Sequence, residues 1–160
     1  MPQIQFQTTI AAPLESVWAF YDNPLTGLPA LSPPEDQAQI ESADLPVKVG
    51  SRITITARGP IGRIRWVARI TEHRPPHAVA FGMEARFVDE QESGPFSAWR
   101  HEHDFEYIDE EKTRLVDRIT YRPPFWPISF LVDLLLVRPK LKRMFRYRHA
   151  QTKRLLEETP

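Results

Sequence analysis

Residues 98–122 read AWRHEHDFEYIDEEKTRLVDRITYR, two alternating runs joined by the acidic turn Asp109-Glu110-Glu111. Pairing Ile108 with Lys112 brings acidic residues opposite arginines, and such cross-strand charge pairs stabilise a register. The pairs are Glu106 with Arg114 and Glu102 with Arg118. The other face then holds Trp99, His101, His103, Phe105 and Tyr107 opposite Tyr121, Ile119, Asp117, Leu115 and Thr113. A slip of one residue would destroy both patterns, so the segment predicts an antiparallel hairpin in this register.

A second hairpin is predicted around the loop at residues 59–62. If Arg58 faces Arg63, every apolar residue of both strands lies on one face. The apolar pairs are Ile53 with Ala68, Ile55 with Trp66 and Ala57 with Ile64.

The rest of the chain supplies further strands and three helical stretches. Strands are predicted at residues 3–10, 37–43, 50–58, 63–73, 77–87, 96–107 and 113–122. A short helix is expected after Pro13, because apolar residues follow it at helical spacing as far as Tyr21. Four prolines between residues 23 and 34 allow only a short helix or an irregular loop there.

A long amphipathic helix is predicted from about residue 128 to 158. Its apolar stripe comprises Phe130, Leu131, Leu134, Leu141, Phe145, Thr152, Leu155 and Leu156. The opposite side carries Lys142, Arg143, Arg146, Lys153 and Arg154. Pro139 should bend this helix or split it from a preceding turn. The plan is therefore an α+β fold, a curved seven-stranded antiparallel sheet around a long C-terminal helix, with two short N-terminal helices.

Composition excludes several classes of function. The 160 residues suit one domain covering 1–160, and the absence of cysteine excludes disulfides, thiolate nucleophiles and cysteine-ligated metals. The 21 basic residues balance 21 acidic ones, which argues against dedicated nucleic-acid binding. The longest apolar run, Leu134 to Val137, is far too short to span a membrane, and the N-terminus lacks the pattern of a signal peptide. We expect a cytoplasmic protein.

Five segments resemble the START-like, helix-grip superfamily, also labelled polyketide cyclase/dehydrase or SRPBCC. They are APLESVWAFY (12–21), LPALSPP (28–34), GPFSAWRHEH (94–103), TRLVDRITYRPPF (113–125) and FRYRH (145–149). The resemblance covers nearly the whole chain. It implies a cavity between the concave sheet face and the C-terminal helix that holds an apolar or amphipathic small molecule. Only some relatives are enzymes, and many merely bind.

His101, His103 and Asp117 are the main candidates for chemistry. In the predicted register Asp117 lies directly across from His103, and a carboxylate there favours a charged imidazole and fixes its tautomer. This pair suits general acid–base catalysis. It also suits a purely structural role, in which two buried polar groups satisfy each other's hydrogen bonds, or a role in orienting a ligand. The three side chains would also suit a facial metal triad, but no metal or cofactor is expected.

Arg148 is the other unusual residue, because it falls within the apolar stripe of the helix. Three roles are open for Arg148. It neutralises a carboxylate in the cavity, it holds an acidic group of the ligand, or its side chain runs along the edge of the stripe with the guanidinium in solvent. The residues expected to bind the ligand are Trp66, Trp99, His101, His103, Phe105, Asp117, Ile119, Tyr121, Phe145 and Arg148.

Three functions follow from the sequence. The first is binding of a small hydrophobic or amphipathic molecule in an internal cavity. The second is an enzyme of the cyclase or dehydratase type that uses His103 and Asp117 as acid and base. The third is a regulatory module that docks on a membrane or an acidic partner, since residues 138–154 hold eight basic residues and no acidic one. The choice between monomer and homodimer stays open.

Overall fold

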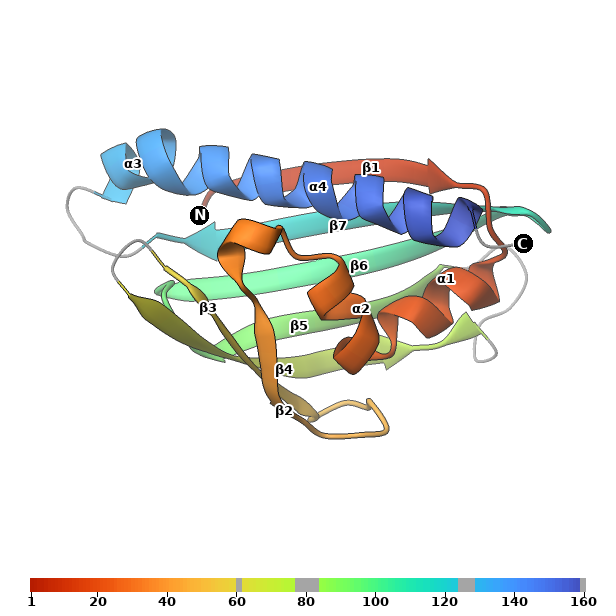
Figure 1. Cartoon of the computed structure of the whole chain (residues 1–160), viewed down its shortest axis with the longest axis horizontal. Coiled ribbons are helices and arrows are strands. Elements are labelled where there is room, and N and C mark those ends of the chain that lie inside the picture. Colours follow the sequence, from red (N-terminus) through yellow and green to blue (C-terminus); the bar gives the residue numbers. More distant parts are fainter. Residues whose placement is uncertain (60–61, 77–83, 124–128, 159–160) are drawn as a thin grey trace.

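A single antiparallel sheet and one long helix laid across it form the frame of the molecule (Figure 1). The computed structural model describes residues 1–59, 62–76, 84–123 and 129–158. The sheet has seven strands in the order β1-β7-β6-β5-β4-β3-β2. The strands are β1 (Gln3–Ile10), β2 (Gln39–Ala43), β3 (Arg52–Arg58), β4 (Arg63–Arg74), β5 (Ala85–Ser93), β6 (Ala98–Asp109) and β7 (Lys112–Arg122). The predicted fold class is confirmed.

Two short helices follow β1, as predicted. Helix α1 (Leu14–Tyr21) begins after Pro13, and α2 (Pro24–Ala30) is followed by a single 3-10 turn, η1 (Pro34–Asp36). The side chain of Asn23 accepts a hydrogen bond from the amide of Leu25 and so caps α2. Gly27 allows the two helices to approach closely, because a Cβ atom there would lie 2.6 Å from the carbonyl oxygen of Phe20.

Both predicted hairpin registers are confirmed. Arg58 pairs with Arg63 in the β3–β4 hairpin, and His103 pairs with Asp117 in the β6–β7 hairpin. A bulge at the end of the second hairpin pairs Asp109, rather than Ile108, with Lys112. Glu106 does contact Arg114 at 2.8 Å. The expected Glu102–Arg118 ion pair is replaced, because Arg118 contacts Asp104 while Glu102 contacts Arg86 and Arg100.

The predicted strand at residues 77–87 is misplaced. Residues 77–83 lie outside the described residues, and β5 runs from Ala85 to Ser93. Acidic residues dominate the end of this strand, yet it lies in the middle of the sheet. Their side chains pair with an arginine and a histidine of the neighbouring β6 and with Arg52 of β3. The extension brings Asp89 into register opposite His101.

The C-terminal helical segment comprises α3 (Ser129–Val132), a π-helical turn η3 (Asp133–Val137) and α4 (Arg138–Glu157). Pro139 lies in the first turn of α4 and does not break it. The wider π turn before it closes with a hydrogen bond from the amide of Arg138 to the carbonyl of Asp133. A proline ring clashes with the carbonyl four residues earlier, and a wider turn relieves that clash. No described helix is long and apolar enough to span a membrane.

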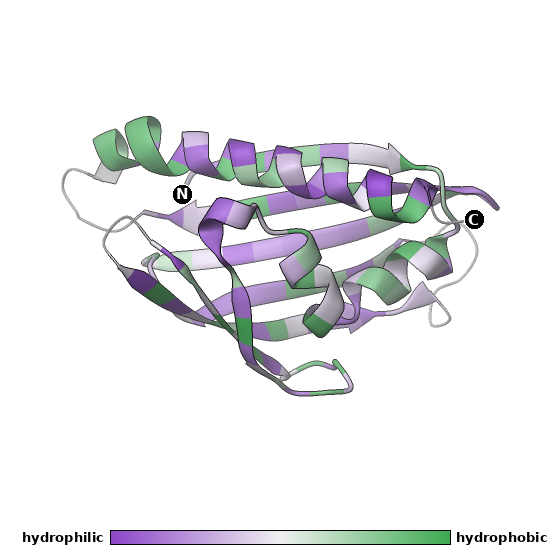
Figure 2. Cartoon of the chain, in the orientation of Figure 1, coloured by the Kyte–Doolittle hydropathy of each residue, from purple (hydrophilic) through white to green (hydrophobic). Residues whose placement is uncertain are grey.

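The predicted apolar stripe holds only along α4. Leu141, Phe145 and Thr152 are buried, whereas Phe130 is 71% exposed and Leu131 and Leu134 are also exposed. The π turn changes the angle between successive residues, so the 100° spacing no longer carries the stripe from α4 back into α3. Figure 2 shows the resulting hydrophobic end of the helix at α3.

Two apolar clusters form the core and meet at a group of buried polar residues. One gathers side chains from α1 and several strands around Trp18, Phe87 and Phe105. The other lies under α4 and contains Trp99, Ile119, Tyr121, Leu141 and Phe145. His103 packs against Phe87 of the first cluster, and His101 packs edge-on against Phe145 of the second. The histidines therefore lie between the two halves of the core.

Candidate functional site

Asp117 on β7 is the centre of the buried polar group. Its side chain is fully buried and accepts hydrogen bonds on both oxygens. Nε2 of His101 lies 3.0 Å from Oδ1, and Nε2 of His149 on α4 lies 2.5 Å from Oδ2. Nδ1 of His103 is 2.8 Å from Oδ1, but within the part of the chain that the structure describes this nitrogen makes no hydrogen bond. Three imidazoles from a strand and a helix thus surround one carboxylate.

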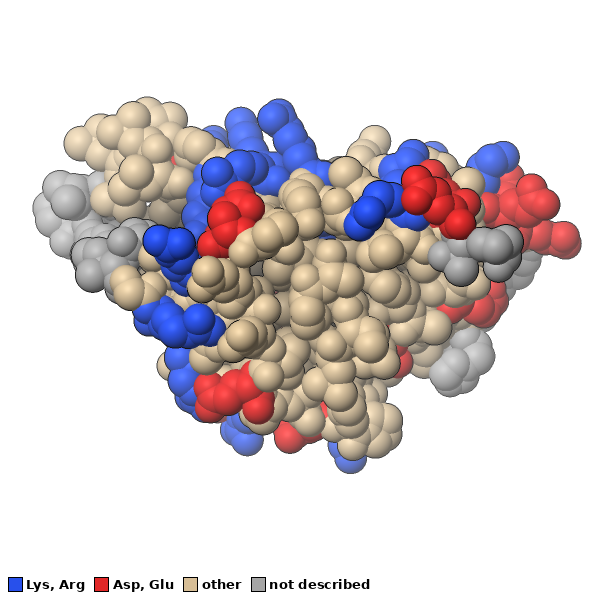
Figure 3. Space-filling view, in the orientation of Figure 1, with Lys and Arg blue, Asp and Glu red and all other residues tan. Residues whose placement is uncertain are grey.

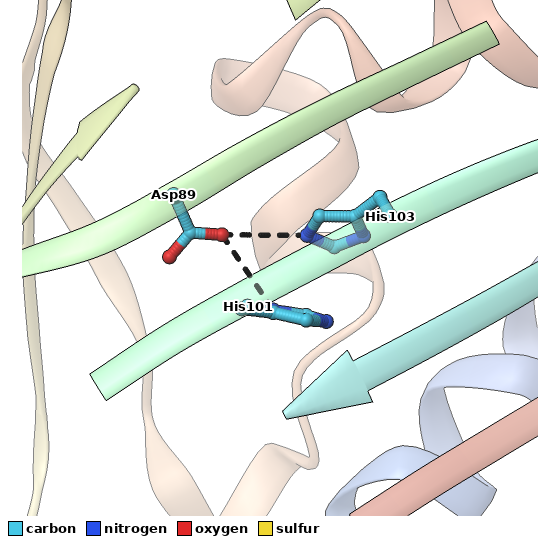
Figure 4. Close-up of side chains that lie close together, drawn as sticks. All are labelled: Asp89, His101 and His103. Atoms are coloured by element: carbon cyan, nitrogen blue, oxygen red, sulfur yellow. Dashed lines mark ion pairs between the residues drawn. The ribbon is translucent and has the colours of Figure 1, made fainter. Parts of the chain in front are cut away.

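Asp89 on β5 closes the other side of the histidine pair. His101 and His103 are two residues apart on β6, so both rings project from the same face of the sheet. Oδ2 of Asp89 lies 3.6 Å from Nδ1 of His101 and 3.4 Å from Nε2 of His103 (Figure 4). Each ring therefore turns one nitrogen toward Asp117 and the other toward Asp89.

The electrostatics of the cluster separate the two histidines. Burial, and then the charge of the neighbouring His103, lower the pKa of His101 to about 4. Burial also opposes a charge on His103, but the carboxylates of Asp117 and Asp89 outweigh it and raise the pKa of that ring. Burial opposes ionisation of Asp117 too, yet His103 and the hydrogen bonds from the histidines hold its pKa well below the usual range. The surroundings accordingly favour the neutral form of His101 and the charged form of His103.

Aromatic rings enclose this cluster. Phe87 stacks on His103 with ring centroids 4.0 Å apart, and the rings of His101 and His103 are 3.7 Å apart. Arg148 lies over the ring of Phe145, 5.0 Å from its centroid, and its buried Nε has no hydrogen-bond partner among the described residues. Burial opposes ionisation of Asp89, but the hydrogen bond from His103 and the charges of both histidines and of Arg148 outweigh it and lower the pKa of Asp89. The guanidinium therefore packs on Phe145, close enough to the cluster for its charge to act on Asp89.

Most of the predicted ligand-binding residues gather beneath α4. Trp66 and Trp99 pack edge to face with centroids 4.8 Å apart, and Phe105, Ile119 and Phe145 are fully buried. Tyr121 is buried as well, but its hydroxyl donates a 2.6 Å hydrogen bond to Asp133 of the η3 turn. Tyr121 thus fixes the start of the C-terminal helix.

Sequence reasoning missed two members of the cluster, Asp89 and His149. Asp89 was predicted to follow the end of a strand, and only the longer β5 places it opposite His101. His149 lies four residues after the buried Phe145, so helical spacing would have placed it on the same inner face of α4. That spacing was the available signal for His149.

A small pocket lies beside the cluster, between the N-terminal helices and the strands. Its lining residues are Tyr21, Asp22, Pro24, Val47, Ile53, Ile70 and Phe87. It offers about 20 Å³ to a water-sized molecule, which is room for one water. Tyr21 and Phe87 line the pocket and also pack against His103, so these two rings separate the pocket from the polar cluster.

Solved structures share this fold across nearly the whole chain. The Zhui aromatase/cyclase from Streptomyces sp. R1128 is 18% identical, with a TM-score of 0.71, and the match covers 98% of this chain and 93% of that one. A START superfamily protein from Mycobacterium smegmatis is 11% identical, with a TM-score of 0.66 and coverage of 96% and 98%. Norcoclaurine synthase from Thalictrum flavum, in complex with dopamine and hydroxybenzaldehyde, is 14% identical, with a TM-score of 0.64 and coverage of 99% and 88%.

Sequence comparison agrees with the fold. No sequence among the curated proteins matches this chain. The family described as polyketide cyclase / dehydrase and lipid transport matches residues 1–157. With its curved antiparallel sheet, its long C-terminal helix and this match over nearly all of its length, the chain belongs to the polyketide cyclase / dehydrase and lipid transport family.

Proposed function

We propose that the protein binds a small amphipathic molecule between the sheet and α4, with the polar group of that molecule held at the His–Asp cluster. The observation that carries this proposal is the burial of Asp117 and Asp89 with three histidines inside an otherwise apolar core. Burying such charges costs several kcal/mol per ion, and apolar residues of similar volume stabilise a core at least as well. A cluster of this kind is therefore better explained by a ligand than by stability.

The surroundings of the cluster suit an aromatic or apolar ligand body. Trp66, Trp99 and Phe145 provide flat faces close to the hydrogen-bonding groups. Norcoclaurine synthase, which has the same fold, is in complex with dopamine and hydroxybenzaldehyde, two small aromatic molecules with polar groups. By analogy, we propose an aromatic or similarly amphipathic ligand for this chain.

We propose that the ligand enters from the small pocket beside Phe87. The rings of Tyr21 and Phe87 are the barrier between that pocket and His103. A rotation of Phe87 would join the two spaces without moving the backbone of the sheet. An entry at this point would also leave α4 in place.

Native mass spectrometry of protein purified without added ligand tests the proposal directly, because a resident molecule would appear as a mass increment. Uptake of a hydrophobic fluorescent probe gives the second readout. Replacing Trp99 or Tyr121 with Ala should change probe uptake more than it changes the circular dichroism spectrum. Val49→Ala, at a site 61% exposed, is the control and should leave uptake unchanged. If the Trp99 and Tyr121 variants both bind the probe like the parent, neither residue faces the binding site.

Acid–base catalysis by His103 and Asp117 is the second candidate function. The observation that favours it is the opposite displacement of the pKa values of His101 and His103, which provides a base and an acid side by side. In a cyclase or dehydratase, Asp117→Asn should reduce turnover of a carbonyl substrate by roughly 10²-fold or more. In a protein that only binds, the same change should alter ligand affinity modestly and shift its pH dependence. We expect the second result. A turnover that collapses in both His103→Gln and Asp117→Asn would establish the enzyme instead.

Docking on an anionic membrane is a further candidate, and the exposed apolar residues of the helical segment favour it. We call these residues the α3 patch: Phe130, Leu131, Leu134, Leu135 and Leu136. Figure 3 shows this end of the molecule without charges, next to the Lys and Arg side chains along α4. An apolar patch beside basic groups suits insertion at an anionic lipid surface.

Co-sedimentation with vesicles tests this docking. The parent should bind vesicles containing phosphatidylserine more strongly than pure phosphatidylcholine vesicles, and salt should weaken the binding. Replacing Leu135 and Leu136 with Ser should abolish the binding. Arg65→Gln, on β4, changes an exposed basic residue away from this surface and serves as the control. Equal binding by the parent and the double variant would rule out the α3 patch as the anchor.

A further inference from the structure

We propose that Asp89, His101 and His103 form a binding site for a divalent transition-metal ion, with Zn²⁺ the ion that the geometry fits. Oδ2 of Asp89 contacts Nδ1 of His101 and Nε2 of His103. The three residues each offer one ligand atom within 4.8 Å of the other two. The proposal rests on this donor geometry and does not depend on the proposed ligand. It reverses the expectation, drawn from the sequence, that no metal is bound.

The two separations between Asp89 and the histidine nitrogens match those around a tetrahedral zinc ion. Oδ2 of Asp89 is 3.4 Å from the donor nitrogen of His103 and 3.6 Å from that of His101. Ligands at 2.0–2.1 Å from a tetrahedral metal are about 3.4 Å apart. An N–H···O hydrogen bond is usually about 2.9 Å long, so the same atoms are too far apart to be explained by strong hydrogen bonds. The dashed lines in Figure 4 mark both separations and show them meeting at one oxygen of Asp89.

The opposite nitrogen of each ring supplies an independent argument. A histidine that binds a metal nearly always points its other ring nitrogen at a carboxylate or a carbonyl, which fixes the tautomer. Here Nε2 of His101 lies 3.0 Å, and Nδ1 of His103 lies 2.8 Å, from the same oxygen of Asp117. Asp117 thus accepts the supporting hydrogen bond from His101 and lies beside the second ring nitrogen of His103. Its second oxygen is held by His149.

The backbone holds the three donors in place. Asp89 and His101 are direct partners in the β5–β6 ladder, and His103 follows two residues later on the same face. Phe87 stacks against His103, and Phe145 packs against His101, so neither ring turns freely. A site whose ligands are already oriented loses little conformational entropy when the metal binds.

The charges around the site indicate what would complete the coordination. If the histidines are neutral, the two positive charges of a divalent ion are balanced by the carboxylates of Asp89 and Asp117. Arg148, whose charge acts on Asp89, then adds one positive charge that no group of the site balances. Three protein ligands leave the fourth tetrahedral position open. We infer that this position takes hydroxide or an anionic oxygen, such as the carboxylate or phenolate of an amphipathic ligand.

Metal titration of chelator-treated protein tests the site. Isothermal titration with Zn²⁺ should give one ion per chain, and Co²⁺ should give the visible absorption of a four-coordinate complex. Asp89→Ala and His103→Gln should each abolish both signals. Asp117→Asn keeps all three donors and should weaken binding by roughly 10–100-fold. His73→Gln is the control. His73 lies outside the proposed site and pairs with Asp22 at 2.8 Å, so this variant should bind the metal like the parent.

The results separate this proposal from the proposed function. Absence of one-to-one binding of Zn²⁺ and Co²⁺ to the folded parent would overturn the metal site, as would unchanged binding by the Asp89 and His103 variants. Asp89→Asn, which keeps the shape of the side chain, replaces Asp89→Ala if circular dichroism shows that the alanine variant is unfolded. Probe uptake by the same chelator-treated protein is measured in parallel. Uptake without metal binding would leave the ligand proposal standing alone.

Discussion

His101 and His103 show how strongly position determines the chemistry of one residue type. They lie on one strand, two residues apart, and are only 3% and 4% exposed. His103 is close to both Asp117 and Asp89 and its pKa is raised, whereas His101 also faces the charge of His103 and its pKa falls to about 4. Two adjacent buried imidazoles do not both take a proton easily, because the first charge disfavours the second.

This difference predicts the acid sensitivity of the metal-free protein. The unfolded chain takes a proton on His101 near its ordinary pKa of 6.5, while the folded chain does so only near 4. Acidification between these values therefore favours unfolding. From pH 7 to pH 5, this one group should lower the free energy of unfolding by roughly 2 kcal/mol. Urea denaturation at both pH values, with a chelator present, measures the loss.

His101→Gln is the test of that assignment. The variant keeps a hydrogen-bonding side chain but has no proton to take up, so its stability should fall much less over the same range. His103 acts in the opposite direction, because its raised pKa makes the folded chain bind this proton more readily than the unfolded chain does. Its stabilisation is complete below the unfolded pKa and is lost as pH rises through the folded pKa. Equal losses in the parent and in His101→Gln would assign the acid sensitivity to other groups.

At the scale of the elements, α4 depends on a few inward side chains. Phe145 is fully buried, stacks on Phe6 of β1 with centroids 5.1 Å apart, and packs against His101. Thr152 accepts or donates a 2.7 Å hydrogen bond with the hydroxyl of Tyr21, which ties the other end of α4 to α1. The helix positions His149 and Arg148 between these two contacts.

Phe145→Ala should therefore loosen α4 from the sheet. Deletion of a buried phenylalanine ring costs about 3–5 kcal/mol. Phe130→Ala removes the same ring at a site 71% exposed and should change the free energy of unfolding by less than about 0.5 kcal/mol. Chemical denaturation of both variants measures the difference. Similar losses would show that α4 is not held by Phe145.

Across the whole molecule, the two faces of the sheet carry separate polar networks. Beneath α4 lies the His–Asp cluster. On the other face, Arg86 contacts Asp104 at 2.9 Å and Glu102 at 3.0 Å, and Arg100 joins the same group through Glu102 and Glu72. Asp104 is fully buried by these neighbours. This second network links β4, β5, β6 and β7 and leaves the inner face free for the site.

The sequence alone determined the pairing within each hairpin and the face on which each side chain lies. Side chains alternate strictly along a strand, so a register that gathers the apolar residues and opposes the charges is fixed locally. His103 opposite Asp117, Ile55 opposite Trp66 and the inward position of Phe145 follow from that pattern. The helix-grip arrangement follows because such a sheet and one amphipathic helix must cover each other.

The tertiary structure decided which polar groups meet. Asp89 reaches the histidines only because β5 extends to Ser93, and His149 reaches Asp117 only because α4 crosses the sheet at that level. Arg118 contacts the buried Asp104, while Glu102 contacts Arg86 and Arg100 from neighbouring positions. These contacts join residues from separate elements, so their geometry depends on the packing of the whole chain, and local periodicity carries no information about it. The proposed metal site, built from Asp89, His101 and His103, belongs to this second class.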